Sequence, residues 1–132
     1  MMKFTGIILF LIHLVLFCWS VGGFLEMILP EVFWKPFTNP AFPDWLLIFH
    51  WSSVLFASVD FIYGYLTHWR KTPMLMTAGY IFMSIVRVIE TFGYMTSDTK
   101  YTAMAVELLS YIIILLLLYR TTYFIKYFGR QL

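Results

Sequence analysis

Charged residues are scarce in this chain. Lys, Arg, Asp and Glu make up 12% of its 132 residues, whereas a typical soluble domain carries about a quarter. The net charge is only +2, with no basic block and no glycine-rich phosphate loop, so we expect no nucleic-acid partner. The single cysteine, Cys18, cannot form an internal disulfide. No zinc-ligand spacing, Cys pair or Ser-His-Asp pattern occurs either, so we predict no metal, no cofactor and no catalytic residue.

Hydrophobic residues take the place of the missing charge, at 61% of the chain. Four apolar runs are long enough to span a bilayer, which takes about 20 residues each; they cover approximately 4–28, 45–67, 74–95 and 102–123. We predict an all-α fold, a four-helix transmembrane bundle forming one integral membrane domain over 1–132. The stretch after Cys18 lacks a small-x-small cleavage pattern, so we interpret the first run as a retained span and not a signal peptide.

The connection between the first two runs, PEVFWKPFTNPAFPDW (30–45), holds four of the five prolines and cannot be regular helix. Its aromatic residues suit the headgroup region; they are Phe33, Trp34, Phe37, Phe42 and Trp45. Two interpretations remain open, an interfacial anchor and a lid over a lateral ligand entrance.

Lys and Arg residues predict the orientation. Six fall on one side of the predicted membrane, namely Lys3, Arg70, Lys71, Arg120, Lys126 and Arg130, and two, Lys35 and Lys100, fall on the other. The positive-inside rule therefore predicts that both termini are cytoplasmic and that the Pro- and aromatic-rich loop is an outer loop. The membrane is expected to be a bacterial inner membrane, the endoplasmic reticulum or another organelle membrane.

Three titratable side chains are predicted to share one layer of the bundle. His50, Glu90 and Glu107 each lie about five residues, or roughly 8 Å, below the outer surface. Arg87 lies one turn deeper than Glu90. Polar and small residues recur every three or four positions on these helices, a spacing that turns them toward other helices and away from lipid.

Because isolated charges are costly inside a membrane, these groups should pair. Arg87 most simply neutralises Glu90, at i+3 on its own helix. Glu107 would then be protonated, share a proton with His50, or meet a cationic ligand. The predicted ligand-binding residues are His50, Arg87, Glu90 and Glu107, with Trp51, Tyr94 and Tyr111, beside Trp19, as aromatic neighbours. His13 and Asp60 are predicted to form a second buried polar pair.

Other interpretations of the same residues remain. They suit a structural polar clamp, contacts to partner membrane subunits or a second copy in a homodimer, or a proton or ion path. A haem between His13 and His50 is not expected, because the two lie on opposite sides of the midplane.

Short sequence pieces resemble the EXPERA superfamily of four-helix membrane proteins, which includes the emopamil-binding sterol isomerase and the sigma-2 receptor. The pieces are EMILP (26–30) at the end of the first helix, FPDW (42–45) at the start of the second, THWRKTP (67–73) in the turn, and Arg120 after the last helix. The resemblance implies a pocket that opens laterally to the bilayer and binds a lipid, a sterol-like molecule or a cationic amphiphile.

The chain departs from that pattern in two places. The isomerases of the superfamily carry a Glu one turn after the second-helix His, where this chain has Val54 after His50. The first-helix Asp of the receptor-like members is also missing, with Glu26 the nearest substitute. We therefore expect a non-catalytic ligand-binding protein, with an accessory subunit and a sterol-isomerase-like enzyme as the alternatives.

Overall fold

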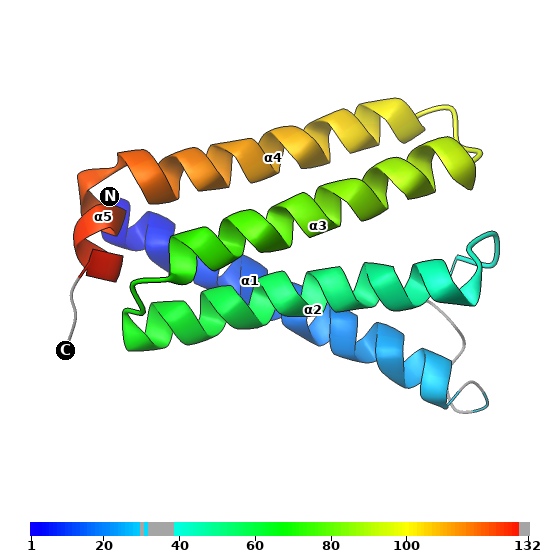
Figure 1. Ribbon diagram of the computed structural model, residues 1–132, viewed down its shortest axis with the longest axis horizontal. Helices are drawn as coiled ribbons and strands as arrows, with labels where there is room; N and C mark the ends of the chain where they lie inside the picture. The colour runs from blue at the N-terminus through cyan, green and yellow to red at the C-terminus, as the bar shows by residue number, and fades with distance from the viewer. Residues whose placement is uncertain (30, 32–38, 130–132) are drawn as a thin grey trace.

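The computed structural model of the chain describes residues 1–29, 31 and 39–129. These residues form five helices and no strands: α1 (Met2–Ile28), α2 (Asp44–Thr67), α3 (Thr72–Gly93), α4 (Lys100–Arg120) and α5 (Thr122–Gly129) (Figure 1). The first four are long and apolar enough to cross a membrane. The prediction of an all-α fold is thus confirmed for the described residues, and the length and composition of the four helices support a multi-pass integral membrane protein.

The predicted spans match α1 to α4 within a few residues at each end. Pro73 lies in the first turn of α3, where its missing N–H costs nothing. The fourth span, predicted at approximately 102–123, ends three residues earlier in the structure. The backbone of Thr121 is extended, with φ −84° and ψ 130°, so α4 stops at Arg120 and the chain turns into the separate helix α5.

The turn between α2 and α3 contains one residue, His68, whose backbone is in the left-handed conformation. His68 has φ 54° and ψ 36°, and the Trp69 N–H donates to the Gly64 carbonyl at 3.0 Å, an arrangement that closes a helix C-terminus. Gly64 also lets α3 approach closely, because a Cβ at this position would lie 1.9 Å from Oγ1 of Thr72.

The closely packed helix pairs follow chain order: α1 with α2, α2 with α3, α3 with α4, and α4 with α5. Figure 1 shows α1 crossing α2 at an angle. Gly23 makes part of that crossing possible, since a Cβ there would lie 2.1 Å from the buried indole of Trp51. In the described part of the chain, α1 and α4 are not a closely packed pair.

The two ends of the bundle differ. The N-terminus, the α2–α3 turn and α5 lie at one end, and the α3–α4 connection lies at the other (Figure 1). Of the predicted aromatic loop, Phe33, Trp34 and Phe37 lie outside the described residues, as do Lys35 and Arg130. Phe42 and Trp45 are described, and each ring lies 6.3 Å from that of Tyr94.

Candidate functional site

A short polar contact joins α2 to α3. The Nδ1 atom of His50 lies 2.5 Å from Oε1 of Glu90, and the Glu90 side chain is only 1% exposed. An ionised carboxylate only accepts hydrogen bonds, so with Glu90 charged the His50 ring donates from Nδ1. The Ser53 hydroxyl donates to the His50 carbonyl at 2.8 Å, within the same turn of α2.

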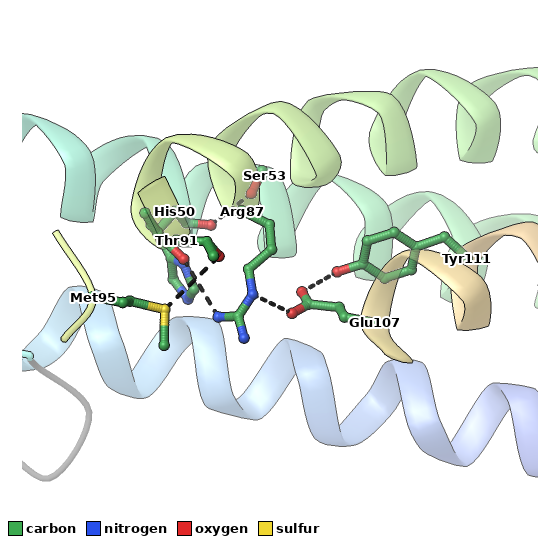
Figure 2. A network of polar contacts seen from close by, with 8 residues as sticks. His50, Ser53, Arg87, Thr91, Met95, Glu107 and Tyr111 are labelled. Atoms are coloured by element: carbon green, nitrogen blue, oxygen red, sulfur yellow. Dashed lines mark hydrogen bonds and ion pairs between the residues drawn. The ribbon is translucent and has the colours of Figure 1, made fainter. Parts of the chain in front are cut away.

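Arg87 lies between two carboxylates. Its Nε atom is 2.8 Å from Oε2 of Glu107 on α4, whereas its Nη1 atom is 3.7 Å from Oε2 of Glu90 on its own helix. Figure 2 shows the guanidinium reaching from α3 toward Glu107. One guanidinium thus faces two carboxyl groups, and the cluster carries excess negative charge unless His50 or one of the carboxyl groups is protonated, or a ligand supplies a cation.

Glu107 is held on both oxygens yet stays accessible. The Tyr111 hydroxyl, one turn further along α4, donates to Oε1, while Arg87 meets Oε2. The Glu107 side chain is 34% exposed, against 17% for Arg87. Because a carboxylate has about four accepting positions, Glu107 can still accept a hydrogen bond from another molecule.

The predicted partners are found in part. Arg87 was expected to neutralise Glu90 and lies 3.7 Å from that carboxylate, but it makes a shorter contact, of 2.8 Å, with Glu107. Glu107 was expected to be protonated, to share a proton with His50 or to meet a cationic ligand; His50 instead contacts Glu90. The i+3 spacing does place Glu90 near Arg87. However, the long Arg side chain reaches the neighbouring helix, and His50 occupies the Glu90 carboxylate.

A cavity of about 410 Å³ lies beside this cluster and is lined from all four spanning helices. Its apolar wall consists of Leu16, Trp19, Val54 and Met83, and its polar wall consists of His50, Arg87, Glu107 and Tyr111. The volume falls in the range of small-molecule sites, about 300–1,000 Å³. Glu90 does not line this cavity; it lies behind it, at a recess of about 10 Å³.

Two predicted aromatic neighbours lie elsewhere. Trp51 is buried against Gly23 at the α1–α2 crossing and does not line the cavity. Tyr94 follows the end of α3, where its ring contacts Phe42 and Trp45. Trp19 and Tyr111 do line the cavity.

The predicted pairing of His13 with Asp60 is wrong, because both ring nitrogens of His13 have other partners. Nδ1 donates to the Leu9 carbonyl at 2.7 Å, so Nε2 accepts the Tyr80 hydroxyl, also at 2.7 Å. Oδ2 of Asp60 is buried and has no hydrogen-bond partner among the described residues. His13 is fully buried and stacks on Phe61 at 4.2 Å.

Sequence reasoning missed the role of Tyr80. Its ring stacks on Tyr111 at 4.8 Å with an interplanar angle of 8°, while its hydroxyl holds His13. Tyr80 shares an α3 face with Ser84 and Arg87, at spacings of four and three residues, and this periodicity was the available signal.

Within the described residues, no group of three His, Cys, Asp or Glu side chains is arranged to hold a metal ion.

No family model, no curated protein and no solved structure matches this chain. The resemblance to the EXPERA superfamily therefore stays a prediction.

Proposed function

We propose that this chain binds a membrane-dissolved amphiphile, either a lipid, a sterol-like molecule or a cationic amphiphile, in the cavity between its four spanning helices. The observation that supports the proposal is the environment of the Glu107 side chain. This carboxylate is one-third exposed, lines the cavity, and is held in place by Arg87 and Tyr111. A fixed acceptor on the polar wall of a cavity whose other wall is apolar orients a ligand by its polar end.

The polar end of the ligand should donate hydrogen bonds. Glu107 accepts, so a hydroxyl or an ammonium group fits, whereas a carboxylate would be repelled by it. The excess of carboxylate over guanidinium in the cluster favours an ammonium further. The apolar body would contact Leu16, Val54 and Met83.

Access from the bilayer is the natural route for such a ligand. Trp19 on α1 lines the cavity and also a groove of about 380 Å³, formed with Leu14, Val15 and Cys18 of α1. Trp19 therefore lies between the cavity and a helix surface that would contact lipid. We propose that the ligand enters between α1 and α4, which do not pack closely in the described chain.

The test is binding of cholesterol and of a single-chain alkylamine to the detergent-purified chain, measured by native mass spectrometry. Glu107→Gln should weaken amine binding about tenfold or more, because a charge-assisted hydrogen bond becomes a neutral one. The matched control is Glu31→Gln, a substitution of an exposed carboxylate outside the helices.

A second pair of variants tests the cavity without touching a charge. Val54→Trp should fill the cavity and abolish binding, whereas Val59→Trp, on a 43% exposed position of the same helix, should not. Unchanged binding of every sterol and amine by both Glu107→Gln and Val54→Trp would overturn the proposal.

A second candidate function is an accessory subunit of a larger membrane complex. It is supported by α4. Among the described residues α4 packs closely against one spanning helix, α3, and its outer face is apolar, carrying Val106, Leu109, Ile113 and Leu116. Helices of a partner subunit, or of a second copy, would cover it. Purification as a lone, monodisperse monomer would count against this candidate.

A sterol-isomerase-like activity has less support. Val54 follows His50 by one turn and lines the cavity, so the second helix supplies no carboxylate at that position. We also propose that the end carrying the N-terminus and α5 faces the cytoplasm, because its exposed residues include Lys and Arg.

A further inference from the structure

Basic side chains from four segments gather at the bundle end that holds the N-terminus and α5. They are Lys3 of α1, Arg70 and Lys71 of the α2–α3 turn, Arg120 at the end of α4, and Lys126 of α5, and all five are exposed. Figure 1 places the start of α1, this turn and α5 at the same end. We call these five residues the basic end.

Acidic residues are missing from the segments that form the basic end. Residues 1–25, 61–89 and 108–129 contain no Asp and no Glu. The acidic side chains of the described chain are instead Glu26, Glu31, Asp44, Asp60, Glu90, Asp98 and Glu107. The positive charges are therefore not neutralised from within these segments, and an anionic partner would be attracted.

The short helix α5 is held firmly across this end. Phe124 and Phe128 are buried in the core cluster, and the Tyr127 hydroxyl donates to the Tyr65 carbonyl at 2.7 Å. The Nδ1 atom of His68 donates to the Tyr127 carbonyl at 3.2 Å. Lys126 is exposed beside Ile125, which is 53% exposed. An apolar and a basic side chain thus share the outer face of α5.

The position of the basic end along the bundle matches the membrane surface. It lies where α2 and α4 stop and α3 begins, so it is at the depth of the lipid headgroups if these helices span. Exposed aromatic rings lie at the same end, with Tyr63 packed edge-on against Trp69 at 5.4 Å and Tyr119 close to Arg120 in sequence. Aromatic and basic residues together are typical of this interface.

We propose that the basic end is a binding surface for anionic lipid headgroups of the surrounding leaflet, and that α5 serves to bring Lys126 into it. The negatively charged phosphates of these lipids lie within reach of exposed Lys and Arg side chains at the ends of spanning helices. This proposal is independent of the cavity, which is formed by other residues.

The experiment uses the full chain in nanodiscs of phosphatidylcholine mixed with phosphatidylglycerol. After gentle extraction, native mass spectrometry measures the ratio of the two lipids retained. The wild type should retain an excess of phosphatidylglycerol that falls as salt is raised. Lys126→Gln should reduce the excess several-fold, about fivefold per lost charge at most, and Arg70→Gln with Lys71→Gln should reduce it further.

Two variants distinguish lipid binding at the basic end from a general effect of the protein's net charge. Lys100→Gln removes one charge at the other end of the bundle, where Lys100 Nζ donates to the Met95 carbonyl, and it should leave the lipid ratio unchanged. Tyr127→Phe keeps every charge but removes the hydroxyl that anchors α5, and it should lower phosphatidylglycerol retention.

Several results would overturn the proposal. One is equal retention of the two lipids by the wild type. Another is an equal loss in Lys100→Gln and Lys126→Gln. Complete displacement of the lipid by millimolar inorganic phosphate would assign the surface to free anions instead. A Tyr127→Phe variant that matches the wild type would remove α5 from the surface.

Discussion

The Nε atom of Arg87 lies 2.8 Å from Oε2 of Glu107, and this contact joins α3 to α4. Because α4 packs closely against no other spanning helix in the described chain, this ion pair and the Tyr80–Tyr111 stack are among the contacts that hold α4 beside the cavity. The residue that orients a ligand in our proposal is thus also a residue that holds the fourth helix.

A double-mutant cycle should show strong coupling between these residues. Arg87→Gln, Glu107→Gln and the double variant should give a coupling free energy of roughly 0.5–3 kcal/mol, the range for residues in one ion-pair network. The value should fall below that of a fully buried pair, since both side chains are partly exposed. Thermal unfolding in detergent measures it. Purely additive effects would mean that the contact does not stabilise the bundle.

The α1–α2 crossing should not tolerate a methyl group at Gly23. Gly23→Ala places Cβ 2.1 Å from the Trp51 ring, and overpacking of this kind costs about 1–3 kcal/mol. The melting temperature in detergent should drop accordingly. Gly93→Ala is the matched control, because a Cβ at that position meets nothing within 4 Å. Equal melting temperatures for the two variants would contradict the crossing geometry.

Tyr80 should matter through its hydroxyl. Tyr80→Phe keeps the ring stack on Tyr111 but leaves Nε2 of the fully buried His13 without its donor. An unsatisfied buried group costs about 1–3 kcal/mol. Tyr101→Phe, at a 50% exposed position, should have almost no effect. Hydrogen exchange of the α1 amides around His13 would report the same difference locally.

Docking of α5 should weaken in alkaline solution. Burial raises the pKa of Tyr127 from 10.0 to about 12. The stabilisation from this hydroxyl is fully present below pH 10, and it is lost as the pH rises toward 12, because the folded state favours the protonated form. NMR of tyrosine labelled with ¹³C at Cζ, with Tyr127→Phe for assignment, measures the titration. A midpoint near 10 would show that Tyr127 is not held in this way.

Hydropathy was sufficient to predict the spans, because a bilayer demands a run of apolar residues whatever the packing. The depth argument also worked for His50 and Glu90, which are in direct contact. It rested on helix rise alone, a quantity that barely varies.

The choice of partners was beyond such arguments. Whether Arg87 turns toward Glu90 or Glu107 depends on the rotation of α3 against α4, and no periodicity specifies that angle. Trp51 and Trp19 both lie on spanning helices. The Trp51 ring packs against Gly23 at the α1–α2 crossing, whereas Trp19 lines the cavity. The break at Thr121 was invisible for a similar reason, since apolar residues continue on both sides of it.

Packing in chain order has a consequence for synthesis of the protein. As the nascent chain leaves the ribosome, α1, α2 and α3 can assemble before α4 is made, and His50, Glu90 and Arg87 then already lie together. Glu107 and Tyr111 arrive with α4. A chain stalled after α3 would therefore have a charge-paired interior but no complete cavity, so under our proposal ligand binding would begin only once α4 is in place.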